Sequence, residues 1–212
     1  MSTMIAIPDR GIYLASRSPR RRELLAQIGV RYHLLLFRER AGEIPEVNED
    51  SLHGEAPSAY VERMARDKAD SGWRRMLQRN LPPAPVLAAD TTVALEGKIY
   101  GKPANREHAA EMLGALSGKR HEVLTGVAFK NHDQVEFALS ASEVVLKKLT
   151  AEEIAQYVAS GECDDKAGAY AIQGRAGRFV VELRGSYSGV MGLPLYETYQ
   201  LLEKMRERRN PY

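Results

Sequence analysis

Five segments of the chain carry helical signals: apolar residues three or four positions apart, a capping residue at the start, or a glycine at the end. At the first of them, Ser18 and Pro19 suit the N-cap and the first helical position. At the fourth, Thr150 and Glu153 form a capping box. The predicted helices span residues 19–28, 58–76, 105–118, 150–161 and 195–209.

Short apolar runs bounded by turn residues predict strands between these helices. Two of the runs flank a turn at residues 131–133, which predicts an antiparallel hairpin. Residues 164–177 and 185–194 are rich in glycine and are expected to form loops. Strands interspersed with helices favour an α/β or α+β fold with a mixed sheet. The predicted strands span residues 12–15, 34–37, 86–89, 98–100, 123–129, 135–146 and 179–183.

The composition is that of an ordinary globular protein, with 212 residues, 44% apolar, 27% charged and a formal net charge of +2. A mostly disordered chain is excluded, and the balance of charge argues against a general binder of nucleic acid or membrane surfaces. The one cysteine, Cys163, rules out an internal disulfide and a thiolate metal cluster. Because no run approaches a membrane span and nothing suggests export, we expect a cytoplasmic protein, with residues 1–212 as one domain of two lobes.

Several common catalytic motifs are absent from the sequence. Gly101 and Lys102 are followed by Pro103, so there is no Walker A loop, and no G-x-G-x-x-G occurs. Tyr187 is the central residue of 185–189, which excludes a nucleophile elbow. The histidines never fall at the short spacing of a helical zinc pair. P-loop, dehydrogenase, serine-hydrolase and zinc-hydrolase functions are therefore disfavoured.

Positive charge is concentrated at the first predicted helix start. Residues 17–22 carry four arginines, beside the hydroxyls of Ser16 and Ser18. The free N–H groups and positive dipole end of a helix, with guanidiniums nearby, suit a phosphate chain. A solvated basic helix start fits this segment equally well. Arg20 and Arg21 are the candidate phosphate ligands if the first interpretation holds.

Three further polar residues are candidates for chemistry. Lys68 continues the apolar face of the second helix, so it either snorkels to solvent or faces a cleft. Asp90 follows an apolar run at the expected end of a central strand, where open α/β sheets place ligands. A carboxylate there holds a divalent metal, deprotonates water or caps the next turn. Lys102, before a proline, is either a fixed cation near the same strand end or a solvated loop residue.

Taken together, these segments resemble the Maf nucleoside triphosphate pyrophosphatases, once called septum formation inhibitors, over nearly the whole chain. Several distinct motifs in the right order carry the resemblance. They are Ala15-Ser16-Arg17-Ser18-Pro19-Arg20-Arg21, Lys68 within 65–69, Ala88-Ala89-Asp90-Thr91, Lys102-Pro103, Leu116-Ser117-Gly118 with His121 and Thr125-Gly126, the run 165–174, and Gly185-Ser186-Tyr187 leading to Gly192-Leu193-Pro194.

The resemblance implies an elongated, inosine triphosphatase-like α/β fold, with a mixed sheet flanked by helices and two lobes around a nucleotide cleft. It also implies a divalent cation, Mg²⁺ or Mn²⁺, frequent homodimerisation, and hydrolysis of a nucleoside triphosphate to the monophosphate and pyrophosphate. By position, Asp90 matches the family's proton acceptor, and we also expect it to bind the metal. The residues expected to bind the substrate are Ser16, Arg20, Arg21, Lys68, Thr91, Lys102 and Gln173.

The residues after the aspartate resemble the branch of the family that acts on dTTP and UTP. Thr91 stands where the branch for 7-methyl-GTP has glutamine, and Arg20, Thr91 and Gln173 match the positions used for substrate choice. A glutamine amide offers a donor and an acceptor together, which can pair with uracil or thymine, although such an amide also commonly stabilises a loop. We therefore expect a dTTP and UTP pyrophosphatase that could also clear modified pyrimidine nucleotides.

Two features depart from the family pattern. Arg17 replaces a residue that is usually small, and either adds a phosphate contact or partly occludes the loop. The acidic residue expected after the first helix has several candidates, of which Glu43 is taken here as the second metal ligand. The rival function is a non-catalytic nucleotide-binding regulator of cell division, but a pure binder has no need of a water-activating carboxylate such as Asp90. The competing acidic residues are Glu39, Glu43, Glu46 and Glu49.

Overall fold

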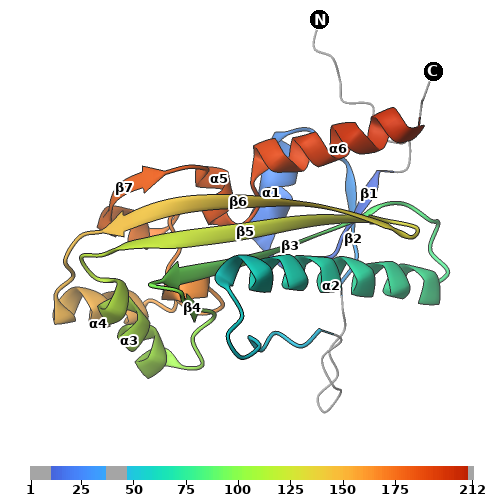
Figure 1. The fold of residues 1–212 in the computed structure, drawn as a ribbon. Helices are drawn as coiled ribbons and strands as arrows, with labels where there is room; N and C mark the ends of the chain where they lie inside the picture. Colours follow the sequence, from blue (N-terminus) through green and yellow to red (C-terminus); the bar gives the residue numbers. More distant parts are fainter. Residues whose placement is uncertain (1–10, 37–46, 210–212) are drawn as a thin grey trace, which may run out of the picture.

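The structure is a computed structural model that describes residues 11–36 and 47–209. In this part of the chain seven strands form one mixed sheet in the order β2-β1-β3-β5-β6-β7, with β4 paired to β3 (Figure 1). β1 pairs in parallel with β2 and β3, and the other pairs are antiparallel. The strands are β1 Ile12–Leu14, β2 Tyr32–Leu34, β3 Val86–Leu95, β4 Lys98–Tyr100, β5 Arg120–Asn131, β6 Gln134–Leu146 and β7 Val180–Arg184.

Helices cover both faces of the sheet, as the predicted α/β fold requires. Figure 1 shows α2 below the long strands β3, β5 and β6, and α6 above them. The helices are α1 Pro19–Gln27, α2 Pro57–Gln78, α3 Arg106–Leu116, α4 Ala151–Ala159, α5 Tyr187–Met191 and α6 Leu195–Arg209, with 3₁₀ turns η1 Ala167–Ala169 and η2 Arg175–Phe179.

Alternation along β3 distributes the core between the two faces. Val86 and Ala88 join a buried cluster with residues of α2, whereas Leu87 and Ala89 join a second cluster with residues of α1 and α6. Successive strand residues point to opposite faces, so an unbroken apolar run is what a strand covered on both sides needs. The same alternation decides where the polar residues that follow Ala89 point.

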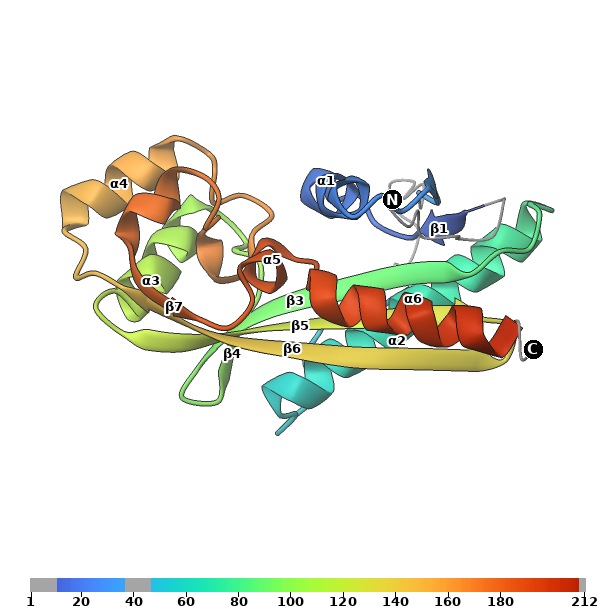
Figure 2. The same ribbon diagram turned by 90° about the horizontal axis from the view of Figure 1, so that it is seen from above.

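The two clusters just described form one lobe of the molecule, and a third buried cluster forms the other lobe. It joins the ends of β3, β5 and β6 to α3, α4 and the 3₁₀ turns, with Leu116, Tyr157 and Phe179 each about 1% exposed or less. Figure 2 shows α3 and α4 gathered at one end of the molecule, and α1 and β1 toward the other. The elongated two-lobed arrangement expected from the resemblance is therefore present.

Two of the five predicted helix starts are confirmed by side-chain capping contacts. The amide N–H of His108 donates to Asn105 Oδ1 at 2.8 Å, and Thr150 forms the predicted capping box with Glu153. Ser18 occupies the N-cap position of α1, but its side chain makes no capping hydrogen bond. The first turn of α1 therefore keeps N–H groups that another partner can use.

Three sequence predictions are corrected by the structure, two of them by strand pairing. The strand predicted at 34–37 begins earlier, as β2 Tyr32–Leu34, because these are the residues that pair with the three residues of β1, and residue 37 lies outside the described residues. The strand predicted at 86–89 continues to Leu95, because β5 pairs with it well beyond the end of β1. The loop predicted at 185–194 contains the short helix α5, started by Ser186, whose hydroxyl accepts from the N–H of Gly189.

Candidate functional site

A pocket of about 700 Å³ opens between the two lobes. It lies where β1 ends and α1 begins, while β3 continues from one lobe into the other. The opening arises because the parallel partner of β3 stops there, which leaves one edge of β3 accessible. Every described residue predicted for substrate binding or catalysis lines this pocket. These residues are Ser16, Arg20, Arg21, Lys68, Asp90, Thr91, Lys102 and Gln173.

Asp90 and Thr91 point to opposite sides of β3 because they are consecutive strand residues. Asp90 faces α2, where its Oδ1 lies 2.6 Å from the Nζ of Lys68. Thr91 faces the other side, where its hydroxyl lies 3.3 Å from Nη2 of Arg21 in α1. The prediction that Asp90 ends a strand is wrong, since it pairs with Gly126 in the middle of β3, but it does lie beyond the end of the parallel pairing with β1.

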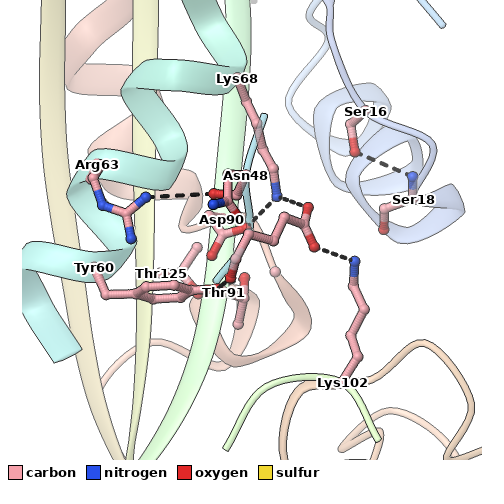
Figure 3. A network of polar contacts seen from close by, with 12 residues as sticks. Ser16, Ser18, Asn48, Tyr60, Arg63, Lys68, Asp90, Thr91, Lys102 and Thr125 are labelled. Carbon is pink, nitrogen blue, oxygen red and sulfur yellow. Dashed lines mark hydrogen bonds and ion pairs between the residues drawn. The ribbon is translucent and has the colours of Figure 1, made fainter. Parts of the chain in front are cut away.

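Glu49 lies between two lysines on the α2 side of the pocket. Its Oε1 is 2.6 Å from Lys68 Nζ and its Oε2 is 3.0 Å from Lys102 Nζ (Figure 3). Burial raises the pKa of this carboxyl, but the two lysines outweigh burial and lower the pKa of Glu49 to about 2. Lys68 contacts Glu49 and Asp90 through one nitrogen, so the two carboxylates converge on a single point.

The start of α2 holds Glu49 in place. The hydroxyl of Tyr60 donates to the Glu49 carbonyl oxygen at 2.9 Å, and Nη2 of Arg63 donates to the Asp50 carbonyl oxygen at 3.0 Å. Both carboxylate oxygens of Glu55 lie 2.7 Å from nitrogens of Arg63, which fixes that guanidinium. Burial raises the pKa of Tyr60, so its hydroxyl keeps the proton it donates. Glu49 is therefore positioned through its backbone as well as its side chain.

Two arginines of α1 line the opposite wall. Arg21 donates to the Gly192 carbonyl oxygen at 2.7 Å and to Ser16 Oγ at 3.2 Å, in addition to its contact with Thr91. Arg20 donates through Nε to the Met191 carbonyl oxygen at 3.2 Å. Burial lowers the pKa of both guanidiniums, although arginine remains charged at neutral pH. Their charge is thus partly desolvated, which strengthens its interaction with a bound anion.

The segment between β1 and α1 suits an anion. Ser16 is buried, and its Oγ accepts from the backbone N–H of Ser18 at 3.2 Å as well as from Arg21. These contacts hold the loop beside the first turn of α1. The free N–H groups of that turn form the positive end of the helix dipole. Arg17 is exposed and also lines the pocket.

The loop from 165 to 173 forms the wall contributed by the second lobe. Asp165 and Ala169 adopt left-handed backbone angles, with φ of 59° and 58°, a conformation that costs free energy and often occurs at functional sites. Gly168 is also left-handed, and a Cβ there would lie 2.8 Å from the Val93 side chain. This close packing against β3 sets the path of the loop, which brings the exposed Gln173 to the pocket.

Sequence reasoning missed part of this site. Glu49 was one of four competing acidic residues, whereas the proposed metal ligand Glu43 lies outside the described residues, as do Glu39 and Glu46. No pattern indicated that Tyr60 contacts Glu49, and the Thr125-Gly126 motif did not indicate that Thr125 lies beside Thr91, because both contacts depend on packing between distant elements. Over residues 11–36 and 47–209, no group of three or more histidine, cysteine, aspartate or glutamate side chains forms a ready metal site.

Comparison with known proteins identifies the family to which this chain belongs. The family described as Maf-like protein matches residues 11–205. The chain belongs to the Maf family. A relative from Nitrosomonas europaea named dTTP/UTP pyrophosphatase is 52% identical over 201 residues, which cover 95% of this chain and 97% of the relative. A Maf relative from Aromatoleum aromaticum with the same name is 56% identical, covering 91% of this chain and 94% of the relative.

A solved structure gives a more distant similarity. The structure of the Staphylococcus aureus Ham1 protein aligns with this Maf-family chain at a TM-score of 0.47 and 14% identity, covering 94% of this chain and 99% of the other. Within the part of the chain that the structure describes, no helix combines the length and apolarity needed to cross a membrane.

Proposed function

We propose that this chain hydrolyses dTTP and UTP to the monophosphate and pyrophosphate. The observation that carries the proposal is the convergence of Lys68, Lys102, Glu49 and Asp90 opposite the basic start of α1, within one pocket. Relatives named dTTP/UTP pyrophosphatase at 52–56% identity support the same activity.

The cations suit a triphosphate. Arg20 and Arg21 line one wall, and Lys68 and Lys102 line the other, so a chain of phosphates between them would meet positive charge on both sides. Such cations stabilise the charge that develops on the phosphate oxygens as the bond between the α and β phosphates breaks. Ser16 and the N–H groups of the first turn of α1 add uncharged donors.

Glu49 and Asp90 fit a small divalent cation such as Mg²⁺ or Mn²⁺. Their nearest oxygens both lie 2.6 Å from Lys68 Nζ, so the two carboxylates already converge around a positive charge. These ions prefer oxygen ligands, and Mg²⁺ commonly takes one or two carboxylates together with substrate phosphates. When bound, the ion supplies neutralisation of charge on the phosphate oxygens.

Asp90 is the proposed base. It lines the pocket and is 9% exposed, and Lys68 fixes one of its oxygens, which leaves the other to orient water. Water adds to phosphorus, the bridging P–O bond between the α and β phosphates breaks, pyrophosphate leaves, and Asp90 takes the proton of the water. A carboxylate held in one orientation lowers the entropic cost of this step.

The decisive experiment is to incubate the purified chain with Mg²⁺ and a panel of UTP, dTTP, CTP, ATP and GTP. We expect pyrophosphate and monophosphate from UTP and dTTP, and absence of pyrophosphate from both would refute the proposal. Asp90→Asn should abolish turnover while retaining nucleotide binding. Asp133→Asn, in the exposed turn between β5 and β6, is the matched control and should keep wild-type activity.

A further inference from the structure

A tight turn brings Gln173 to the pocket. The N–H of Gly174 donates to the carbonyl oxygen of Ala171 at 3.0 Å, so residues 171–174 form one β-turn with Gln173 at its third position. The first three residues of this turn line the pocket. Because Gln173 is exposed rather than packed in the core, its position follows from how the two ends of the turn are held.

Tyr157 of α4 holds the first end of the turn. Its side chain is 1% exposed, and its hydroxyl accepts from the N–H of Ala171 at 3.2 Å. The same hydroxyl donates its hydrogen to Oε1 of Glu162 at 3.1 Å. Burial raises the pKa of Tyr157, so the hydroxyl keeps this hydrogen at neutral pH. The ring packs edge-on against Phe179, with centroids 5.6 Å apart, which fixes the hydroxyl from the core side.

Glu162 holds the second end of the turn. Its Oε2 accepts from the N–H of Arg175 at 3.0 Å, and its Oε1 accepts from the N–H of Ala176 at 3.4 Å. These two residues begin the 3₁₀ turn η2, and the first N–H groups of a helix have no partner within it. A Cβ on Gly174 would overlap the carboxylate of Glu162, so only glycine lets the backbone of the turn come this close.

The end of α4 sets the position of Glu162. The helix ends at Ala159, and Gly161 adopts a left-handed φ of 71°, which is common just after a helix. The N–H of Gly161 donates to the carbonyl oxygen of Val158 at 3.0 Å, and the N–H of Glu162 donates to Ser160 Oγ at 3.3 Å. Val158 is buried in the core of the second lobe. Both ends of the 171–174 turn are therefore attached to one helix end that is itself fixed by the core.

Both carboxylate oxygens of Glu162 are needed as acceptors. Oε1 receives the hydroxyl of Tyr157 and the N–H of Ala176, and Oε2 receives the N–H of Arg175. A glutamine would place an NH₂ group, which can only donate, at one of these two positions. In either orientation that group would face the N–H of Ala176 or of Arg175, and a hydrogen bond would be lost. The turn therefore requires a carboxylate here, and not merely a polar side chain of the same length.

We propose that Glu162 is a positioning residue that, together with Tyr157, holds the 171–174 turn so that Gln173 meets the bound nucleotide. The inference rests on the proposed pyrophosphatase function. It holds whichever part of the nucleotide Gln173 contacts, because Glu162 and Tyr157 fix the backbone that carries this side chain. Neither Glu162 nor Tyr157 is among the described residues that line the pocket, so both act on the site through the turn.

Steady-state kinetics with UTP and Mg²⁺ test the proposal in wild type, Glu162→Gln, Gln173→Ala and the double variant. Glu162→Gln should raise KM about tenfold, as Gln173→Ala does, and change kcat by less than about twofold. In the double variant KM should rise about tenfold and not about a hundredfold, because Glu162 acts through a side chain that is no longer present. Glu152→Gln, the same change at an exposed position of α4, is the matched control and should keep the wild-type KM.

A merely structural role of Glu162 gives a different result. Loss of folded protein lowers the apparent kcat, because fewer molecules are active, and leaves KM unchanged. Such a loss, effects on KM that multiply in the double variant, or an unchanged KM in Glu162→Gln or in Gln173→Ala would overturn the proposal. If Glu162→Gln does not fold, Tyr157→Phe, which keeps the ring and removes the hydroxyl, takes its place in the same comparison. Absence of UTP hydrolysis by the wild-type chain would refute the proposed function and this inference with it.

Discussion

Acid should destabilise this protein through His121 before most of its carboxylates are protonated. His121 is 2% exposed in β5, and its Nε2 lies 2.9 Å from the hydroxyl of Tyr170 in the wall of the pocket. Burial lowers the pKa of His121 to about 4, against a slight opposing effect from the backbone of Lys119. The imidazole is therefore neutral in the folded protein at pH values where it would be protonated in the unfolded chain.

The magnitude follows from the difference between these pKa values. The stabilisation is fully present above the unfolded value of 6.5 and is lost as the pH falls toward the folded value of about 4. At about 1.36 kcal/mol per pH unit the complete loss is about 3.4 kcal/mol, of which about 2.5 kcal/mol falls between about pH 7.5 and about pH 4.5. A loss of this size is a large part of the stability of an ordinary domain.

Urea unfolding of wild type and His121→Gln at these two pH values measures the effect. Glutamine can still pair with Tyr170 but does not titrate, so the free energy of unfolding should change by about 2.5 kcal/mol less in the variant than in the wild type. Other titrating groups cancel in this comparison. His53→Gln, the same change on an exposed side chain, is the control. Equal pH dependence in wild type and His121→Gln would refute the reasoning.

Four further predictions concern the site and the core. Chelation of divalent metal should stop pyrophosphate release, with recovery on adding Mg²⁺, and activity that survives chelation would contradict the proposed metal role. Glu49→Gln should lower kcat/KM for UTP at least about tenfold. The free energy of unfolding in urea should change by less than about 1 kcal/mol, because the ion pairs of Glu49 with Lys68 and Lys102 are partly exposed. Gln173→Ala should raise the KM for UTP about tenfold, because it removes a contact to the base. Inhibition by pyrophosphate should stay unchanged, because no contact to phosphate is lost. Weaker inhibition by pyrophosphate would place Gln173 at the phosphates instead. Phe129→Ala, at a core residue 1% exposed, should cost about 3–5 kcal/mol in urea unfolding, and a cost below about 1 kcal/mol would contradict its packing.

Local signals predicted most elements, because they depend on residues close together in the chain. The caps at Asn105 and Thr150 and the hairpin around 131–133 are formed by neighbours, and all three are present. The predictions failed where a distant partner sets the length of an element. β2 is limited by the short β1, and β3 is extended past Asp90 by its pairing with β5.

The same division holds for the candidate site. The sequence by itself determined that the pocket residues of β1–α1, α2, β3 and the 165–173 loop belong to a Maf-family chain, because each motif is contiguous. Only the tertiary structure distinguished Glu49 from its competitors as a partner of Lys68 and Lys102, since these contacts join residues 19 and 53 positions apart. The register of β3 and β5 likewise placed Thr125 opposite Thr91. Strand register and helix docking are set by burial of the whole core, so the pairing of Thr91 with Thr125 could not be read from any local pattern.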